Sequence, residues 1–254
     1  MAISRVWHQV RRTKRMKTLI AKTLTPICSG LIYLLHNRAT SSFNRLELQS
    51  VQFSFSQFGE DLAVLRVAEQ LGLKKGIYVD AGAYHPIFGS NTLLLHKQGW
   101  RGINIDLSRD RIAAFSRYRS SDHNVVACLS DKIAPVDIAH YEISSTDRII
   151  DSTDQEKLSL AGQRPIRYST AITTTLTAVI ESSSFRLQDV QFLNVDCEGH
   201  DLAVLRGLDL QRCRPNILSV EAMTDAERGA LVEFLRLGGY RLETIIPPTY
   251  IFVR

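Results

Sequence analysis

An apolar, strand-like run in this chain ends in an acid and a glycine, Asp80 and Gly82. In an open parallel sheet, ligands bind outside the carboxyl ends of the strands, so both residues could contact a ligand there. A glycine admits a nucleotide-like ligand close to the backbone because it has no Cβ. Ala83, Tyr84 and His85 replace the later glycines of a dinucleotide-binding turn, which disfavours a pyrophosphate site. The alternative interpretation is a tight strand-to-helix turn without a ligand.

Two more acids follow the next two strand-like runs. Asp106 comes 26 residues after Asp80, a spacing at which a carboxylate can accept both hydroxyls of an adenosine ribose. It could instead cap a helix that begins at Arg109. Asp131 follows Ser130, where a carboxylate could contact an adenine amino group or serve only as a turn residue. The three acids together predict a nucleoside site.

Asp196, Glu198 and His200 follow a fourth apolar run. Because alternate residues of a strand point the same way, both carboxylates project to one side as the strand ends. With the imidazole beside them, they could bind a cation, act as a general base, or hold a substrate ammonium or hydroxyl group. Capping of the next helix would account for one of these acids. A divalent ion could bind between these acids. No third residue at metal-ligand spacing can be named, however, so no metal ligand is assigned.

Short apolar runs alternate with helical patterns from about residue 51, which is typical of a parallel sheet with helical crossovers. The expected strands are residues 76–83, 102–107, 125–129, 192–196 and 217–221. The expected helices are residues 56–71, 91–98, 109–117, 176–182, 202–207 and 225–237. Two apolar runs, 240–246 and 250–253, flank a Pro-Pro-Thr turn and predict an antiparallel hairpin. The polar segment 144–170 is expected to be a flexible loop or lid.

The charge of the chain is unevenly distributed. Its 254 residues carry a formal charge of +5, yet residues 1–50 hold nine Lys and Arg and one acid, a net charge of +8. The remaining 204 residues hold 22 basic and 25 acidic side chains, a net charge of −3. We therefore expect a basic N-terminal extension, residues 1–50, on one α/β domain, residues 51–254. Nucleic acid is not expected as a partner because that domain has no basic patch interleaved with aromatics.

The basic extension is also partly apolar. Residues 3–10 have apolar side chains at helical spacing, and the largely apolar segment 19–35 is too short for a typical spanning helix. A peripheral contact with an anionic membrane surface, a helix docked on the domain, and a cleaved or spanning segment stay open. The four cysteines are widely spaced, which favours a reduced, cytoplasmic setting. We expect a cytoplasmic protein that associates peripherally with membranes.

From about Phe55 onward, the chain resembles the FkbM-type S-adenosylmethionine-dependent methyltransferases. The motifs occur in family order with plausible spacing, and the match is specific as a set. They are Ser56–Asp61 (SQFGED), Val79–Pro86 (VDAGAYHP), Ser90–Thr92 (SNT), Trp100–Asp106 (WRGINID), Thr175–Leu176 (TL) and Phe192–His200 (FLNVDCEGH). Two departures are Cys197, where the family usually has an aliphatic residue, and segment 144–170.

This resemblance implies a Rossmann-like methyltransferase domain with a mostly parallel, seven-stranded sheet and an antiparallel C-terminal hairpin. It implies that S-adenosylmethionine is the cofactor and that Asp196 and Glu198 form a wall of the site. The residues expected to contact the cofactor are Asp80, Gly82, Ala83, Asp106, Asp131, Gln57, Asp61 and Asn91.

Methyl transfer to a hydroxyl requires a base as well as alignment of donor and acceptor. The candidates are Glu198, Asp196 and His200, and His85 could reach in from the first loop. The resemblance implies hydroxyl acceptors, often on sugars, so we expect O-methylation of a sugar, polysaccharide or glycolipid. Two alternatives are a non-catalytic, membrane-docked nucleotide-binding module and a nucleotide-dependent oxidoreductase.

A variant that begins at Ser50 tests the expected role of the extension. We expect it to lose binding to anionic liposomes, because the +8 charge is removed, and to keep cofactor binding. Liposome co-sedimentation and calorimetric titration measure the two properties. Sedimentation of the truncated protein with anionic vesicles would contradict this division of roles.

Overall fold

The computed structural model describes residues 51–141, 147–150 and 164–254. The chain divides after Phe53, and the unit Ser54–Arg254 contains every helix and strand of the described residues. The expected N-terminal extension, residues 1–50, lies outside the described residues. Within the described part, no helix is both long enough and apolar enough to cross a membrane.

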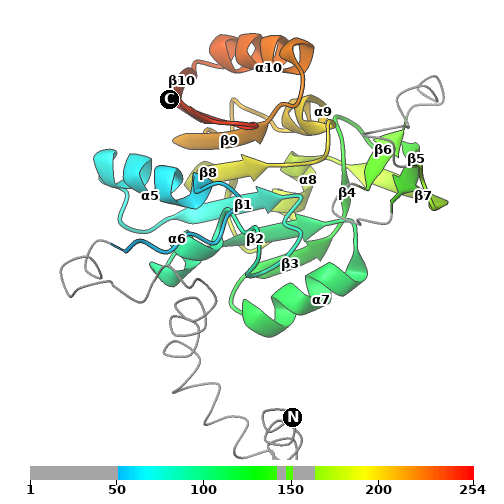
Figure 1. The fold of residues 1–254 in the computed structure, drawn as a ribbon, viewed down its shortest axis with the longest axis horizontal. Coiled ribbons are helices and arrows are strands. Elements are labelled where there is room, and N and C mark those ends of the chain that lie inside the picture. Colours follow the sequence, from blue (N-terminus) through cyan, green and yellow to red (C-terminus); the bar gives the residue numbers. More distant parts are fainter. Residues whose placement is uncertain (1–50, 142–146, 151–163) are drawn as a thin grey trace, which may run out of the picture. The chain divides into compact units, whose positions relative to one another are not determined.

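A seven-stranded sheet forms the centre of this unit, in the order β10-β11-β9-β8-β1-β2-β3 (Figure 1). Neighbouring strands from β3 to β9 are parallel, and β11 runs antiparallel to both β9 and β10. The expected mostly parallel sheet with an antiparallel C-terminal hairpin is therefore confirmed. The strands are β1 Ile77–Ala81, β2 Arg101–Asp106, β3 His123–Val126, β8 Val190–Val195, β9 Ile217–Glu221, β10 Arg241–Ile246 and β11 Thr249–Val253.

Helices cover both faces of the sheet, because successive strand residues alternate between two apolar layers. Val79 and Leu193 face the layer that contains α8, α9 and α10, whereas Tyr78 and Phe192 face the layer of α5 and α6 (Figure 1). Helix α7 packs against β2 and β3. The helices are α5 Glu60–Gln70, α6 Leu93–Lys97, α7 Arg109–Tyr118, α8 Leu176–Glu181, α9 Asp201–Arg206 and α10 Asp225–Leu237, with a 3₁₀ turn at Leu187–Asp189.

A second, four-stranded sheet was not predicted. It has the order β4-β7-β5-β6, with β4 Cys128–Leu129, β5 Pro135–His140, β6 Arg148–Ile150 and β7 Arg167–Thr174. The expected strand 125–129 is split, because its first part pairs with β2 and its last two residues pair with β7. The loop expected at 144–170 is wrong where it is described, since β6 and the start of β7 lie within it. Residues 144–146 and 151–163 of that segment lie outside the described residues.

The first helix begins later than the expected 56–71. Gly59 has φ +91°, a left-handed conformation that ends the preceding turn, and α5 starts at Glu60. The carboxylate of Asp61 accepts hydrogen bonds from Ser54 Oγ (2.6 Å), Phe55 N (2.7 Å) and Ser56 Oγ (2.9 Å). These bonds stabilise residues 54–59 as a loop that wraps the start of α5.

Two glycines provide a matched test of the packing. Alanine at Gly102 would place its Cβ 2.2 Å from the Tyr78 carbonyl oxygen, so we expect Gly102→Ala to lower the free energy of unfolding by about 3 kcal/mol or more. Gly229 lies within α10 with open space where a Cβ would stand, so Gly229→Ala should raise that free energy by about 0.5–1 kcal/mol. Urea denaturation measures both changes, and a Gly102→Ala protein as stable as the original would refute the close packing of β1 on β2.

Candidate active site

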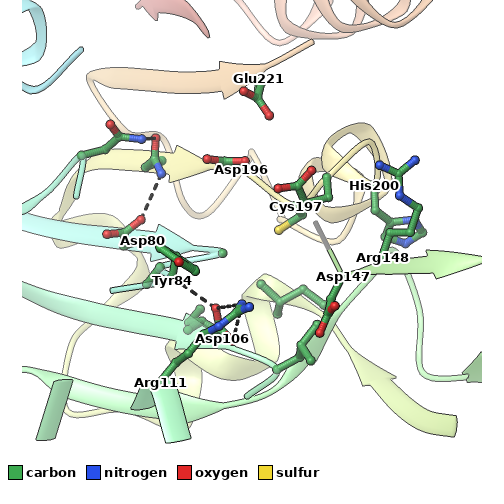
Figure 2. A pocket seen from close by; sticks show the side chains of 18 of the residues that line it. Asp80, Tyr84, Asp106, Arg111, Asp147, Arg148, Asp196, Cys197, His200 and Glu221 are labelled. Atoms are coloured by element: carbon green, nitrogen blue, oxygen red, sulfur yellow. Dashed lines mark hydrogen bonds and ion pairs between the residues drawn. The ribbon is translucent and has the colours of Figure 1, made fainter. Parts of the chain in front are cut away.

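A cavity of about 370 Å³ lies along the carboxyl ends of the parallel strands, between the two sheets. Its size is that of a small-molecule site, and its position is the one at which open parallel sheets bind ligands. Figure 2 shows that its side chains come from β1, β2, β8, β9, α7 and the second sheet. The expected site residues that line it are Gln57, Asp80, Gly82, Ala83, Asn91, Asp106, Asp196, Glu198 and His200.

Asp80 lies near the end of the central strand and is almost completely buried. Its carboxylate accepts hydrogen bonds from Thr92 Oγ1 (2.6 Å) and Asn194 Nδ2 (3.0 Å). Asn91 Nδ2 in turn donates to Asn194 Oδ1 at 3.3 Å, which ties the wall of the cavity to the strand. Burial raises the pKa of Asp80, and the two hydrogen bonds oppose that shift. The side chain therefore connects β1, β8 and the loop that follows β1.

The structure gives a second reason for a glycine at position 82, which the sequence did not reveal. Gly82 has φ +82°, and a Cβ at this position would lie 1.7 Å from the backbone oxygen of Asp196. The expectation was that a glycine admits a ligand, and Gly82 does line the cavity. The geometry adds that only a glycine lets the end of β8 approach so closely. The amides of Gly82 and Ala83 both donate to Ile105 O at 3.0 Å.

Asp106 lies at the end of β2 in a network of donors. Its carboxylate accepts from Ser108 N (2.7 Å) and Tyr84 N (3.2 Å) and forms an ion pair with Arg111 (3.1 Å). Burial raises the pKa of Asp106, whereas the Arg111 guanidinium lowers it. The alternative role of Asp106 as a helix cap is wrong, because the Ser108 side chain caps α7. Arg111 also lies 4.9 Å from the centre of the Tyr84 ring, as a cation–π contact.

Two residues with side chains have left-handed backbone conformations, Tyr84 with φ 46° and Glu198 with φ 54°. Within the described residues, they are the only non-glycine residues of this kind, and both line the cavity. Such conformations cost about 1–3 kcal/mol and are common at ligand sites. The two strained residues lie in the loops after β1 and β8, so strain is concentrated where the cavity is built.

The opposite end of the cavity is acidic. Asp196 and Glu198 follow β8, and Glu221 ends the neighbouring strand β9. Burial raises the pKa of Glu198, while Arg148 and Arg111 oppose the shift. Burial and the neighbouring carboxyl groups raise the pKa of Asp196 well above its usual value, and burial raises the pKa of Glu221 to about 7.

The neighbouring loop is held by Asp201, which is not among the expected site residues. Its carboxylate accepts from Cys197 N (3.1 Å) and Gly199 N (3.0 Å), so the role of organising the start of α9 belongs to Asp201. Burial raises its pKa to about 8. His200 lies at the cap position of α9, where its Nε2 contacts Ser130 Oγ at 2.9 Å, and burial lowers its pKa.

Three expected residues do not line the cavity. Asp131 is exposed next to Ser130, and Asp61 is buried in the loop before α5, where it bonds to Ser54 and Ser56. His85 turns back on its own loop, because its Nδ1 accepts from the amides of residues 87 and 88. Gln57, which precedes Asp61, does reach the cavity.

Several charged residues that line the cavity were not among the expected site residues, including Glu221, Arg111 and Arg148. Glu221 had a usable signal, because it ends an expected strand just as Asp80, Asp106 and Asp196 do. Arg111 lies one turn into an expected helix, and only the packing of α7 shows that it reaches Asp106. Arg148 belongs to β6, in a segment expected to be a loop, so no pattern indicated it. Within the described part of the chain, no cluster of three His, Cys, Asp or Glu side chains could hold a metal ion.

The comparisons with known proteins identify the family. The model of the methyltransferase FkbM domain matches residues 80–242. The chain belongs to the FkbM methyltransferase family. A solved O-methyltransferase from Bacillus cereus, in complex with SAH, is 11% identical with a TM-score of 0.40, over 93% of this chain and 96% of that one. No curated protein matches the chain significantly.

Family membership confirms the expected S-adenosylmethionine-dependent methyltransferase and decides against the oxidoreductase alternative. The matched residues, 80–242, include the ends of β1, β2, β8 and β9, which build the cavity.

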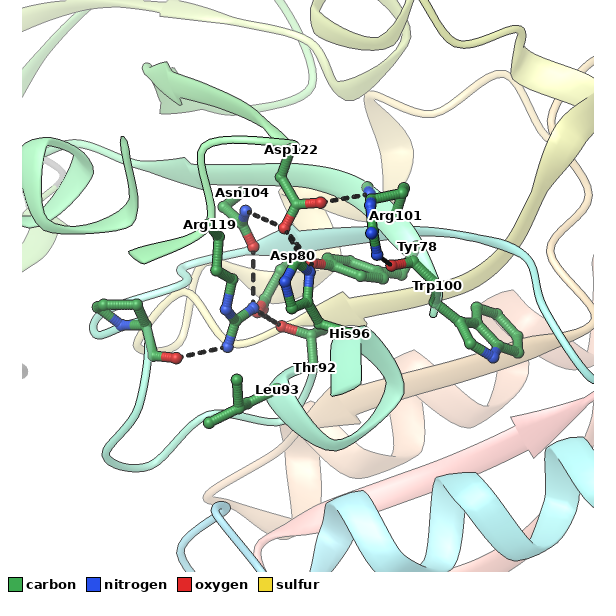
Figure 3. Close-up of polar contacts among 12 residues, drawn as sticks. Tyr78, Asp80, Thr92, Leu93, His96, Trp100, Arg101, Asn104, Arg119 and Asp122 are labelled. Carbon is green, nitrogen blue, oxygen red and sulfur yellow. Dashed lines mark hydrogen bonds and ion pairs between the residues drawn. The ribbon is translucent and has the colours of Figure 1, made fainter. Parts of the chain in front are cut away.

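In this FkbM methyltransferase, a buried polar network supports the loop between β1 and α6, on one wall of the cavity (Figure 3). Arg119, which follows α7 and is 2% exposed, donates to Ser90 Oγ (2.6 Å), Pro86 O (2.7 Å) and Thr92 Oγ1 (2.7 Å). The Thr92 hydroxyl in turn donates to Asp80. One guanidinium group therefore holds the loop of residues 86–92, whose residues 88, 89 and 91 line the cavity.

A second centre of this network is Asp122. It accepts hydrogen bonds from Gly102 N (3.2 Å), Asn104 Nδ2 (3.3 Å) and the Tyr78 hydroxyl, and its side chain lies 3.1 Å from His96. These contacts fix the polar side of β1 and β2.

Loss of the buried guanidinium tests this network. We expect Arg119→Met to lower the free energy of unfolding by about 3 kcal/mol, because it leaves several buried oxygens without a donor. Arg117→Met, on the exposed face of α7, is the matched control and should change it by less than about 0.5 kcal/mol. Chemical denaturation measures both, and equal effects of the two variants would contradict the role of Arg119.

Proposed function

We propose that this FkbM methyltransferase binds S-adenosylmethionine in the cavity and O-methylates a sugar, polysaccharide or glycolipid. The observation that carries the proposal is the continuous cavity that joins Asp106, at the end of β2, to Asp196 and Glu221, at the ends of β8 and β9. One end suits an adenosine and the other suits a reacting hydroxyl.

The donor groups fit the cofactor. The Asp106 carboxylate is suited to accept both ribose hydroxyls, and apolar Leu107, Ala127 and Leu129 offer a surface for an adenine ring. The acidic end suits the positive sulfonium and ammonium groups, since opposite charges attract strongly where water is scarce. When bound, S-adenosylmethionine supplies an electrophilic methyl group, and the protein supplies alignment and a base.

The acidic end also bears on the acceptor. Asp196, Glu198 and Glu221 all line it, so a phosphate or carboxylate near the reacting atom would be repelled. Neutral hydroxyls, which donate hydrogen bonds to carboxylates, are favoured. This supports the expected glycan acceptor. The proposed peripheral contact of residues 1–50 with an anionic membrane would place the domain close to glycolipid or envelope glycans.

Transfer of radiolabelled methyl groups to cell-envelope glycans and lipids, with and without magnesium, tests this function. We expect labelled glycan from the unaltered protein and roughly tenfold less, or lower still, from Asp106→Ala when S-adenosylmethionine is well below saturation. The loss of charge-assisted ribose hydrogen bonds should weaken S-adenosylmethionine binding by about 1.5–3 kcal/mol, roughly tenfold or more. Calorimetric titration measures that affinity.

Asp137→Ala, which removes an exposed carboxylate on β5, is the control and should keep both binding and transfer. Label found only in protein or nucleic acid would refute the acceptor class. Unchanged affinity in Asp106→Ala would refute the assignment of the ribose end.

A further inference from the structure

Asp196 and Glu221 form a carboxyl pair at the acceptor end of the cavity. Val195 and Val220 are partners in the parallel pairing of β8 with β9, so the two acids that follow lie opposite each other. Both line the cavity, and Figure 2 shows them next to each other above Cys197. Two ionised carboxylates in neighbouring positions repel each other, so such a pair is favoured when one member holds a proton.

The surroundings of the pair favour retention of that proton. The charged groups that act most on the pair are other carboxyl groups: Glu60, Asp80, Glu198 and Asp201. The basic side chains Arg111 and Arg148 also line the cavity and act on Glu198. Glu221 also lines a second cavity of about 300 Å³, together with Asp201 and Glu227. Crowded, partly buried carboxyl groups bind protons above their usual pH range, and here burial and like charges both raise the pKa values of the pair.

We infer that Asp196 and Glu221 share one proton in the free protein, that the positive charge of the bound methyl donor expels it, and that the ionised pair then takes the proton of the acceptor hydroxyl. This inference rests on the proposed function, because it requires the donor in the same cavity. It assigns Glu221 as a catalytic residue.

The charges balance over one turnover. Binding of the sulfonium cation releases the shared proton to solvent, which leaves two carboxylates. The acceptor oxygen then forms a bond to the methyl carbon while the carbon–sulfur bond breaks and its electron pair stays on sulfur. The hydroxyl proton passes to the pair. The products are a methyl ether, a neutral thioether and a pair that again holds one proton, so its protonation follows the charge of the cofactor.

The other candidate bases are less suited to this role. The His200 imidazole contacts Ser130 Oγ, and burial lowers its pKa, which weakens it as a proton acceptor. Glu198 is influenced by two arginines, so its carboxylate is already partly compensated. The pair has the stronger electrostatic response to a cation because the charges that act most on it are all negative.

Calorimetric titration with S-adenosylmethionine and S-adenosylhomocysteine tests the inference without an acceptor. Proton release is obtained from the dependence of the binding heat on the ionisation enthalpy of the buffer. At about pH 6.5 the α-amino group of either ligand, with a pKa of roughly 8, stays protonated. A nearby cation lowers the pKa of a carboxyl group. We therefore expect a proton to be released with S-adenosylmethionine, and little or none with S-adenosylhomocysteine, whose sulfur carries no charge.

Glu221→Gln keeps the size of the side chain and removes its titration. We expect it to bind S-adenosylhomocysteine with unchanged affinity and to lose the proton release that accompanies S-adenosylmethionine binding. Glu69→Gln, an exposed carboxyl on α5, is the matched control and should keep the release. A chelator in all titrations should leave the result unchanged.

The outcomes separate the two proposals. Equal proton release with both ligands, or release that persists in Glu221→Gln, would overturn the inference while leaving the cofactor site intact. Binding of neither ligand to the unaltered protein would overturn the proposed function itself. Loss of S-adenosylhomocysteine binding in Glu221→Gln would overturn the assignment of Glu221 as a catalytic residue. Asp196→Asn removes the other member of the pair and provides the second variant.

Discussion

The close approach of the ends of β1 and β8 is the contact on which the site depends. It exists because Gly82 has no Cβ where the backbone oxygen of Asp196 lies. Parallel pairing of β1 with both β2 and β8 then brings Asp80, Asp106 and Asp196 to one edge of the sheet. A side chain at Gly82 would separate these strands and enlarge the spacing of the three carboxylates.

Because of this arrangement, the two ends of the cavity differ in their charged groups. At the β2 end, Asp106 has a cationic partner, Arg111, and two amide donors. At the β9 end, Glu221 and Asp196 have each other and further carboxyl groups. A ligand with a polar, hydroxylated end and a cationic end is therefore favoured in one orientation. The same asymmetry favours neutral hydroxyl groups beside the transferred methyl group.

Rigidity of the loop after β1 comes from a single buried side chain. Arg119 reaches three oxygens of residues 86–92 and, through Thr92, the carboxylate of Asp80. Because a buried guanidinium keeps its charge, the hydrogen bonds that it donates to the loop are charge-assisted and strong. Tyr84, in the same loop, has a left-handed backbone conformation. It is maintained by the hydrogen bond that the Tyr84 backbone N–H donates to Asp106 and by the contact of the ring with Arg111.

The amino-acid sequence by itself determined the main sheet, its helical crossovers and the acids at the strand ends, because burial imposes periodic patterns that can be read locally. It also determined the family, through motifs that keep their order. Only the tertiary structure decided the partners: Asp201 rather than Asp196 or Glu198 organises the loop before α9, Asp61 and Asp131 lie away from the cavity, and Glu221 joins Asp196. The second sheet was missed because its short strands lack long apolar runs, and its order depends on pairing between segments far apart. Hydrogen bonds and charge interactions between distant residues depend on how the strands pair, and periodicity does not record that pairing.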